Sequence, residues 1–159
     1  MLKFFKTASL GGMIIAILII GSCSKQKNNV IPDVYVDFTI DLESPDFASL
    51  TVAGSFDTIN ATTQGWGAPA AGYDGNGIIV YTGPDQYLAY DRTCPHDFVT
   101  SGKSIKIKVD YAVATCPLCG TKYDLSAFGT PVSGPGKYPL KNYNTTLSNN
   151  RYLRVWNNR

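Results

Sequence analysis

Cys94-Pro95-His96 and Cys116-Pro117-Leu118-Cys119-Gly120 are the two short motifs around which the rest of this sequence is organised. Nineteen residues, 97 to 115, separate the motifs, which together hold three of the four cysteines and the only histidine. Thiols and imidazoles are metal ligands, and two tight clusters of them on separate loops suit a metal ion or an iron–sulfur cluster. The sequence therefore predicts a fold that brings two loops together around a metal centre.

The first 22 residues have the features of a secretory signal. Lys3 and Lys6 give a positive start, and an uncharged run of eleven residues follows from Leu10 to Ile20. That run is shorter than the about 20 apolar residues that a membrane-spanning helix needs. Its end, Ile20-Gly21-Ser22-Cys23, resembles a bacterial lipobox. We therefore predict a lipoprotein signal peptide over residues 1–22 with lipid attached to Cys23, and an ordinary anchor helix with an incidental cysteine is the alternative.

The mature chain beginning at Cys23 has 137 residues (159 minus 22), a length that suits one domain with its own core. Residues 24–30 are polar, so we predict a flexible tether over residues 23–31 and a single domain over residues 32–159. Loss of Lys3 and Lys6 lowers the formal charge from +2 to 0. The sequence has no block of basic residues, and its aromatic residues are not interleaved with lysine or arginine, so nucleic acid is not an expected partner. The expected location is extracytoplasmic, lipid-anchored to a bacterial membrane and facing the periplasm or the cell exterior.

Alternation of apolar and polar residues predicts strands throughout the domain. Apolar side chains alternate from Val34 to Asp41, and a turn at Gly83-Pro84-Asp85 joins two apolar runs into a hairpin. The expected strands are residues 34–41, 49–53, 78–82, 86–91, 104–115, 122–125, 140–147 and 152–156, with a long loop over 54–77 that has room for a short strand and a second loop over 129–138. No stretch of the mature chain shows convincing helical periodicity. The predicted fold is therefore all-β and antiparallel.

The two cysteine motifs and the residues after them resemble the cluster-binding loops of Rieske-type iron–sulfur domains. Those domains carry Cys-x-His on the first loop and Cys-x-x-His on the second, where this chain has Cys94-x-His96 and Cys116-x-x-Cys119. Gly120-Thr121-Lys122-Tyr123-Asp124 is similar to the segment that follows the second loop in the family, and Gly134-Pro135-Gly136 is similar to its proline loop. The resemblance covers residues 88 to 142. It implies a Rieske-like antiparallel sandwich with a small cluster-binding subdomain, about residues 89–137, formed by two loops.

The same resemblance implies a ligand set for a [2Fe–2S] cluster. Cys94 and Cys116 would hold the inner iron, while His96 and Cys119 would hold the outer iron, with Cys119 in the place of the family's second histidine. Thr121 and Tyr123 would donate hydrogen bonds to the cluster sulfurs. Their alternative roles are local, since Thr121 can cap a turn and Tyr123 can pack beneath it. Asp97, beside His96, is expected at the surface.

Three states of this site remain open on the sequence alone. The first is a [2Fe–2S] cluster, and the second is a structural zinc ion held by three cysteines and a histidine. The third is a site without a metal, in which Cys116 and Cys119 form a disulfide. The first state predicts a membrane-anchored one-electron carrier rather than a stand-alone enzyme, with a redox protein or membrane complex docking near His96 and Cys119. The other two states predict a structural or binding lipoprotein.

Overall fold

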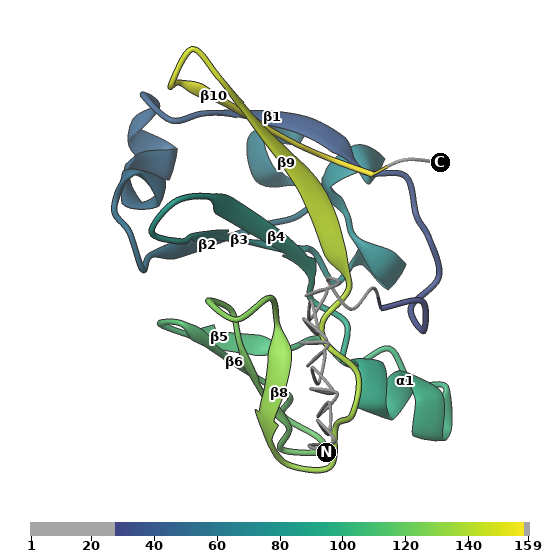
Figure 1. The fold of residues 1–159 in the computed structure, drawn as a ribbon. Helices are drawn as coiled ribbons and strands as arrows, with labels where there is room; N and C mark the ends of the chain where they lie inside the picture. Colours follow the sequence, from purple (N-terminus) through teal and green to yellow (C-terminus); the bar gives the residue numbers. More distant parts are fainter. Residues whose placement is uncertain (1–27, 158–159) are drawn as a thin grey trace, which may run out of the picture.

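The computed structural model describes residues 28–157 as two antiparallel sheets, shown in Figure 1. The larger sheet has six strands in the order β1-β10-β9-β4-β3-β2, and the smaller has four in the order β5-β6-β7-β8. The strands are β1 (Asp37–Asp41), β2 (Phe56–Ile59), β3 (Ile78–Thr82), β4 (Tyr87–Asp91), β5 (Lys108–Asp110), β6 (Val113–Thr115), β7 (Lys122–Asp124), β8 (Thr130–Ser133), β9 (Asn142–Ser148) and β10 (Tyr152–Trp156). The prediction of an all-β antiparallel fold is confirmed.

The helices are short. The described part of the chain has one α-helix, α1 (Pro95–Ser101), and four 3₁₀ turns, η1 (Pro45–Thr51), η2 (Thr63–Gly65), η3 (Ala68–Ala70) and η4 (Tyr73–Gly75). Among residues 28–157, no helix has the length and apolar character needed to cross a membrane. The signal peptide predicted over residues 1–22 and the lipidation predicted at Cys23 lie outside the described residues.

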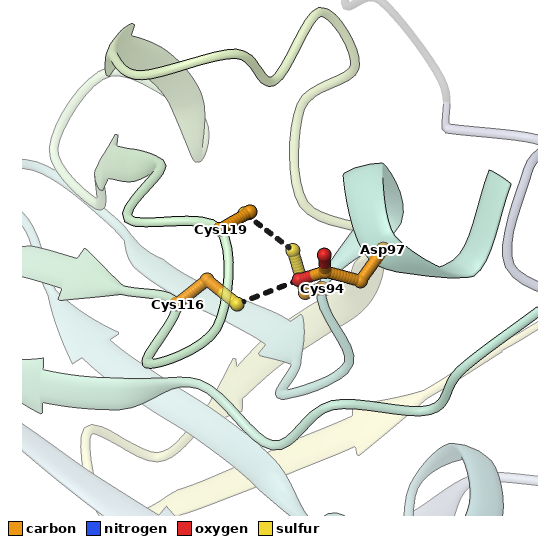
Figure 2. A group of neighbouring side chains, drawn as sticks. All are labelled: Cys94, Asp97, Cys116 and Cys119. Carbon is orange, nitrogen blue, oxygen red and sulfur yellow. Dashed lines mark hydrogen bonds between the residues drawn. The ribbon is translucent and has the colours of Figure 1, made fainter. Parts of the chain in front are cut away.

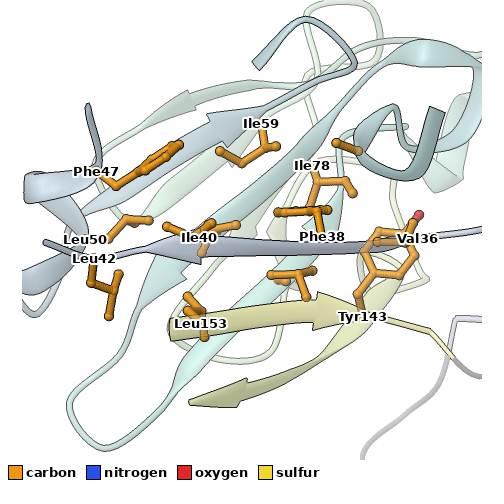
Figure 3. Packing of buried hydrophobic residues seen from close by; sticks show 14 residues of the cluster. Val36, Phe38, Ile40, Leu42, Phe47, Leu50, Ile59, Ile78, Tyr143 and Leu153 are labelled. Atoms are coloured by element: carbon orange, nitrogen blue, oxygen red, sulfur yellow. The ribbon is translucent and has the colours of Figure 1, made fainter. Parts of the chain in front are cut away.

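The main hydrophobic core fills the curl of the six-stranded sheet. Figure 3 shows β1 and β10 contributing Phe38, Ile40 and Leu153 to one side, while Ile59 and Ile78 face them from β2 and β3. Successive side chains in a strand point to opposite faces, so residues two apart lie on the same face. Phe38 and Ile40 are two residues apart in β1, and both are buried on the face toward this core. The alternation recognised in the sequence therefore faces this core.

A second core joins the larger sheet to the smaller one. All five residues of β3 are buried: Ile78 and Val80 face the main core, while Ile79 and Tyr81 belong to the second core. The Tyr90 hydroxyl of β4 crosses this second core and donates a hydrogen bond to the Leu125 carbonyl at 2.8 Å. The smaller sheet is therefore fixed against the larger one, and the loops that it carries are held in place.

Two predicted strands are wrong. Residues 49–53 are not a strand, because Pro45 begins η1, whose Phe47 and Leu50 are both buried one turn apart. Proline suits a first helical position because its φ is already near the helical value. Residues 104–115 are not one strand but the hairpin of β5 and β6, which turns at the exposed Tyr111 with a φ of 52°.

Three further segments depart from the sequence-based expectation. Residues 130–133, expected within a loop, form β8 and pair with β7. Helix α1 was not expected, and with seven residues it is too short for helical periodicity to be visible. The predicted tether ends earlier than residue 31, because Asn28 and Ile31 are buried and the Asn28 amide donates a hydrogen bond to the Pro139 carbonyl at 2.6 Å.

Candidate metal centre

The first cysteine loop follows β4 and leads into α1. Cys94 is the residue before the helix, and its backbone N–H donates a hydrogen bond to the Ile105 carbonyl at 2.9 Å. Pro95 occupies the first helical position, and Gly102 ends the helix in the left-handed conformation with a φ of 66°. A proline at the first helical position and a left-handed glycine after the last turn are common start and stop signals of a helix. They fix the direction in which the Cys94 thiol points, and that thiol is fully buried.

The second cysteine loop is the turn between β6 and β7. The Cys116 N–H donates a hydrogen bond to the Thr121 carbonyl at 2.9 Å, and the Gly120 N–H donates one to the Cys116 carbonyl at 3.1 Å. Gly120 has a φ of 73°, a conformation that glycine adopts without strain. This tight turn buries Cys116 and leaves Cys119 half-buried.

Four potential ligand atoms from the two loops meet in one group. The Sγ atoms of Cys94, Cys116 and Cys119 and a carboxylate oxygen of Asp97 all lie within 4.8 Å of one another. Figure 2 marks two contacts within the group, between the Cys94 and Cys119 sulfurs at 3.7 Å and between the Cys116 thiol and the Asp97 carboxylate at 2.8 Å. The three cysteines are free. The fold therefore gathers three thiols and one carboxylate at a single place.

The structure places Asp97 and His96 differently from the sequence-based expectation. Asp97 was expected at the surface but is only 5 % exposed, which makes that prediction wrong. His96, the predicted fourth ligand, is half-buried and is not a member of the four-residue group. The signal that was missed is the three-residue spacing of Cys94 and Asp97. In a helix that begins at Pro95, this spacing makes Cys94 the N-cap and Asp97 the third helical residue, but the sequence alone does not reveal that helix.

The predicted supporting residues lie against the thiols. The Tyr123 hydroxyl is 3.5 Å from the Cys94 sulfur, and the Cys119 thiol donates a hydrogen bond to the Thr121 hydroxyl at 3.2 Å. Both supporting side chains are fully buried. The Gly136 N–H also donates a hydrogen bond to the Thr121 hydroxyl at 3.0 Å, so the segment that resembles the proline loop contacts the second cysteine loop.

Gly134 is required for that close approach. A Cβ atom at this position would lie 2.6 Å from the Thr121 Cα, and the φ of Gly134 is 88°. Any other residue would push the covering segment away from the second loop. The glycine predicted from the family resemblance therefore has a steric reason in this chain.

Burial and hydrogen bonding control ionisation in the four-residue group. Burial raises the pKa of the Cys94 thiol to about 11 and also raises the pKa of the Cys116 thiol. Burial acts against ionisation of Asp97 too, but hydrogen bonds from Cys116, Cys94 and Cys119 outweigh it and hold the pKa of this carboxyl below its usual value. Thiols with raised pKa values are protonated at neutral pH, so binding of a metal ion here would release protons.

The donor set fits a metal centre in number and in kind. Three thiols and one carboxylate make four donors, the number that tetrahedral zinc takes, and a [2Fe–2S] cluster also takes four protein ligands. The donors come from two loops that are each fixed by backbone hydrogen bonds. Thiolates bind both zinc and iron, so the chemistry of the donors admits either metal.

Comparison with known proteins finds similarity among solved structures alone. No protein-family model and no curated protein matches the chain. A chain from a complex of reduced oxygenase and oxidized ferredoxin in carbazole 1,9a-dioxygenase has 16 % identity and a TM-score of 0.47, over 78 % of this chain and 96 % of that one.

Two further solved structures are similar at the same low level of identity. The ferredoxin of carbazole 1,9a-dioxygenase from Nocardioides aromaticivorans IC177 has 16 % identity and a TM-score of 0.43, over 67 % of this chain and 88 % of that one. Sphingomonas yanoikuyae B1 ferredoxin has 19 % identity and a TM-score of 0.36, over 52 % of this chain and 74 % of that one. The matched regions thus span most of each of these proteins.

Proposed function

We propose that this chain is a one-electron carrier that holds a Rieske-like [2Fe–2S] cluster between its two cysteine loops. The observation that carries the proposal is the convergence of three free cysteines from the two motifs that resemble Rieske cluster loops, together with a fourth donor, Asp97, which directly follows the first motif. A bound cluster would supply the chemistry, by accepting and releasing one electron. The chain would act as an electron-transfer protein or subunit rather than as a stand-alone enzyme.

The residues of the chain have separate tasks in this proposal. Cys94 and Cys116, 0 % and 1 % exposed, would hold the inner iron away from water. Cys119 is half-buried, so the outer iron and the edge near His96 and Cys119 would face a redox protein or membrane complex. Thr121 and Tyr123 would stabilise charge on the ligand sulfurs by hydrogen bonding.

A structural zinc ion is the second candidate, and one distance favours it. A tetrahedral zinc ion with Zn–S bonds of about 2.3 Å sets its sulfur ligands about 3.8 Å apart. The Cys94 and Cys119 sulfurs are 3.7 Å apart. In this case the centre would join the two loops and carry no electron.

Metal and sulfide analysis tests the proposal directly. The full chain, purified without oxygen, should be red-brown and should contain about two iron atoms and two acid-labile sulfides per chain. A colourless protein with about one zinc ion per chain would overturn the cluster proposal in favour of the structural site. A colourless protein with neither metal would overturn both.

The Tyr123→Phe substitution should lower the reduction potential of the cluster. It removes the hydroxyl 3.5 Å from the Cys94 sulfur, and a donor at this sulfur favours the more negative, reduced state. One hydrogen bond of about 1 kcal/mol corresponds to about 40 mV for a single electron. Protein-film voltammetry of wild type and variant measures the shift.

Tyr90→Phe is the matched control for this shift. Tyr90 lies in the same core, but its hydroxyl donates a hydrogen bond to the Leu125 carbonyl rather than contacting a cysteine. Its loss should reduce stability by about 1 kcal/mol and leave the potential unchanged. Equal potential shifts in the two variants would show that the Tyr123 hydroxyl has no specific effect on the sulfur.

We also propose that lipid on Cys23 anchors the protein to an extracytoplasmic membrane surface, because the preceding residues resemble a lipobox. Cys23→Ala should move the protein to the soluble fraction or leave an uncleaved precursor, whereas the neighbouring Ser24→Ala should stay membrane-bound. Stable anchoring implies more than one acyl chain, since one chain binds membranes only marginally. Detection by intact mass of residues 1–22 on the wild-type protein would contradict this prediction.

A further inference from the structure

We propose that Asp97, rather than His96, supplies the fourth ligand of the metal centre, which makes the ligand set three cysteines and one aspartate. This inference rests on the proposed function only in requiring that the two cysteine loops bind a metal. It assigns a metal-binding role to a residue that the Cys-x-His motif does not include. Three independent features of the first loop lead to this assignment.

The first feature is the position of each residue in helix α1. Cys94 is the N-cap, His96 is the second helical residue and Asp97 is the third. In a capping box, the side chains of the N-cap and of the third helical residue each reach the backbone of the other, so these two positions lie on the same side of the first turn. The second helical residue is turned away by about 100°. The helix therefore brings Asp97 to Cys94, and its carboxylate oxygen lies within 4.8 Å of all three cysteine sulfurs.

The second feature is the burial of the Asp97 carboxylate. An acidic residue in the first turn of a helix interacts favourably with the helix dipole even when it is exposed to water, so this interaction does not require burial. This one is 5 % exposed, and its carboxylate accepts a hydrogen bond from the Cys116 thiol on the opposite loop at 2.8 Å. Burying a carboxylate is unfavourable unless it is hydrogen-bonded, paired with a charge or bound to a metal, and here its partner is a cysteine of the candidate centre. Helix capping alone therefore does not account for the position of this side chain.

The third feature is the anchoring of the helix that carries both residues. Pro95 is buried, and the Phe98 ring packs edge-on against Tyr73 with the ring centres 5.4 Å apart. The Ser101 hydroxyl donates a hydrogen bond to the Asp97 carbonyl at 2.8 Å. These contacts hold α1 in the orientation that places Asp97 beside the three thiols, and His96 is not among the residues whose ligand atoms gather there.

The ligand set has a chemical consequence. A carboxylate carries a negative charge where a neutral imidazole carries none, so the set of three thiolates and a carboxylate is fully anionic. It also presents an oxygen donor, which zinc accepts at about 2.0–2.2 Å beside thiolate sulfurs. A centre with this set would hold a metal without any contribution from the single histidine of the chain.

Zinc affinity of the full chain tests the assignment through a readout other than electron transfer. Asp97→Asn keeps the shape of the side chain and removes its charge, and His96→Asn is the matched control on the same helix. With Zn²⁺ as the probe and a chromophoric chelator as the competitor, we expect Asp97→Asn to weaken binding at least about 100-fold. We expect His96→Asn to change it less than about threefold. The reverse order of effects, or unchanged affinity in both variants, would overturn the assignment.

A second substitution separates ligation from folding. If Asp97 is a ligand, Asp97→Cys should restore tight Zn²⁺ binding, because a thiolate can take the same place. Circular dichroism of each variant reports the fold. If Asp97→Cys binds zinc no better than Asp97→Asn while both are folded, the assignment is overturned.

The outcomes for this inference and for the cluster proposal are distinct. A wild-type protein with zinc but no iron or sulfide, whose affinity depends on Asp97, would overturn the cluster and support the aspartate ligand. An iron–sulfur cluster that survives Asp97→Asn but is lost in His96→Asn would support the cluster and overturn the aspartate ligand. A full chain that binds neither metal would overturn both.

Discussion

Substitution of Cys116 by serine should abolish metal binding, the largest effect that we expect from a single change in this chain. Cys116 is 1 % exposed, its thiol donates a hydrogen bond to the Asp97 carboxylate at 2.8 Å, and its sulfur lies within 4.8 Å of the other two cysteine sulfurs. Serine keeps the size of the side chain and a hydrogen-bond donor for Asp97, but its hydroxyl is a much poorer metal ligand than a thiolate. Metal content should fall below about one-tenth of the wild-type value, since a three-donor site lacks a complete coordination shell.

The same substitution should reveal how much of the stability depends on the metal. Metal binding contributes to folding where the unfolded chain has no preformed site, and structural zinc is worth about 10–16 kcal/mol in small domains. We therefore expect wild-type protein to unfold at a higher temperature with metal than after chelation, and Cys116→Ser to show no such difference. Cys116→Ala adds a cavity, so comparing it with Cys116→Ser separates packing from ligation. Full metal content in Cys116→Ser would remove this residue from the ligand set.

Local signals in the sequence were sufficient for the two long hairpins. β3 and β4 pair around Gly83-Pro84-Asp85, and β9 pairs with β10 around Asn149 and Asn150, whose φ values are 52° and 53°. Asparagine tolerates this left-handed conformation and glycine and proline favour turns, so both tips are visible in the sequence. Hairpins depend on neighbouring residues, which is why their strands were predicted closely.

Long-range pairing left no such signal. β1 pairs with β10 in a register that joins Asp37 to Trp156, residues at opposite ends of the described chain. Nothing in the alternation of β1 identifies its partner strand, because the pattern reports only which face is buried. The arrangement of the two sheets therefore required the structure, although their antiparallel class did not.

The candidate site shows the same division between local and long-range information. The two cysteine motifs identify Cys94, Cys116 and Cys119, which the fold brings together. The burial of Asp97 depends on a helix of seven residues, and a segment of that length shows no periodicity that distinguishes it from a loop. Its role was therefore hidden, because the direction of a side chain depends on backbone conformation as well as on spacing.

Substitution of Asp91 by alanine should destabilise the fold by about 3–5 kcal/mol, since it leaves three donors without their acceptor. The buried Asp91 carboxylate accepts hydrogen bonds from the Tyr73 N–H at 2.6 Å, the Thr93 N–H at 2.8 Å and the Tyr143 hydroxyl at 2.7 Å. These groups belong to η4, to the first cysteine loop and to β9. One side chain therefore joins three segments, one of which leads directly into the candidate metal centre.

Urea denaturation of the metal-free chain measures this loss without a contribution from the metal. Burial raises the pKa of the Tyr143 hydroxyl, so it remains a donor over the ordinary pH range. Tyr143→Phe is thus the matched control: it removes one of the three hydrogen bonds and should cost about 1–2 kcal/mol. Comparable losses in the two variants would show that Tyr143 alone accounts for the effect of Asp91. The Asp91 carboxylate accepts a hydrogen bond from the N–H of Thr93, the residue directly before Cys94. A larger loss of stability in Asp91→Ala than in Tyr143→Phe, together with weaker Zn²⁺ binding, would therefore show that Asp91 also holds the first cysteine loop in its binding position.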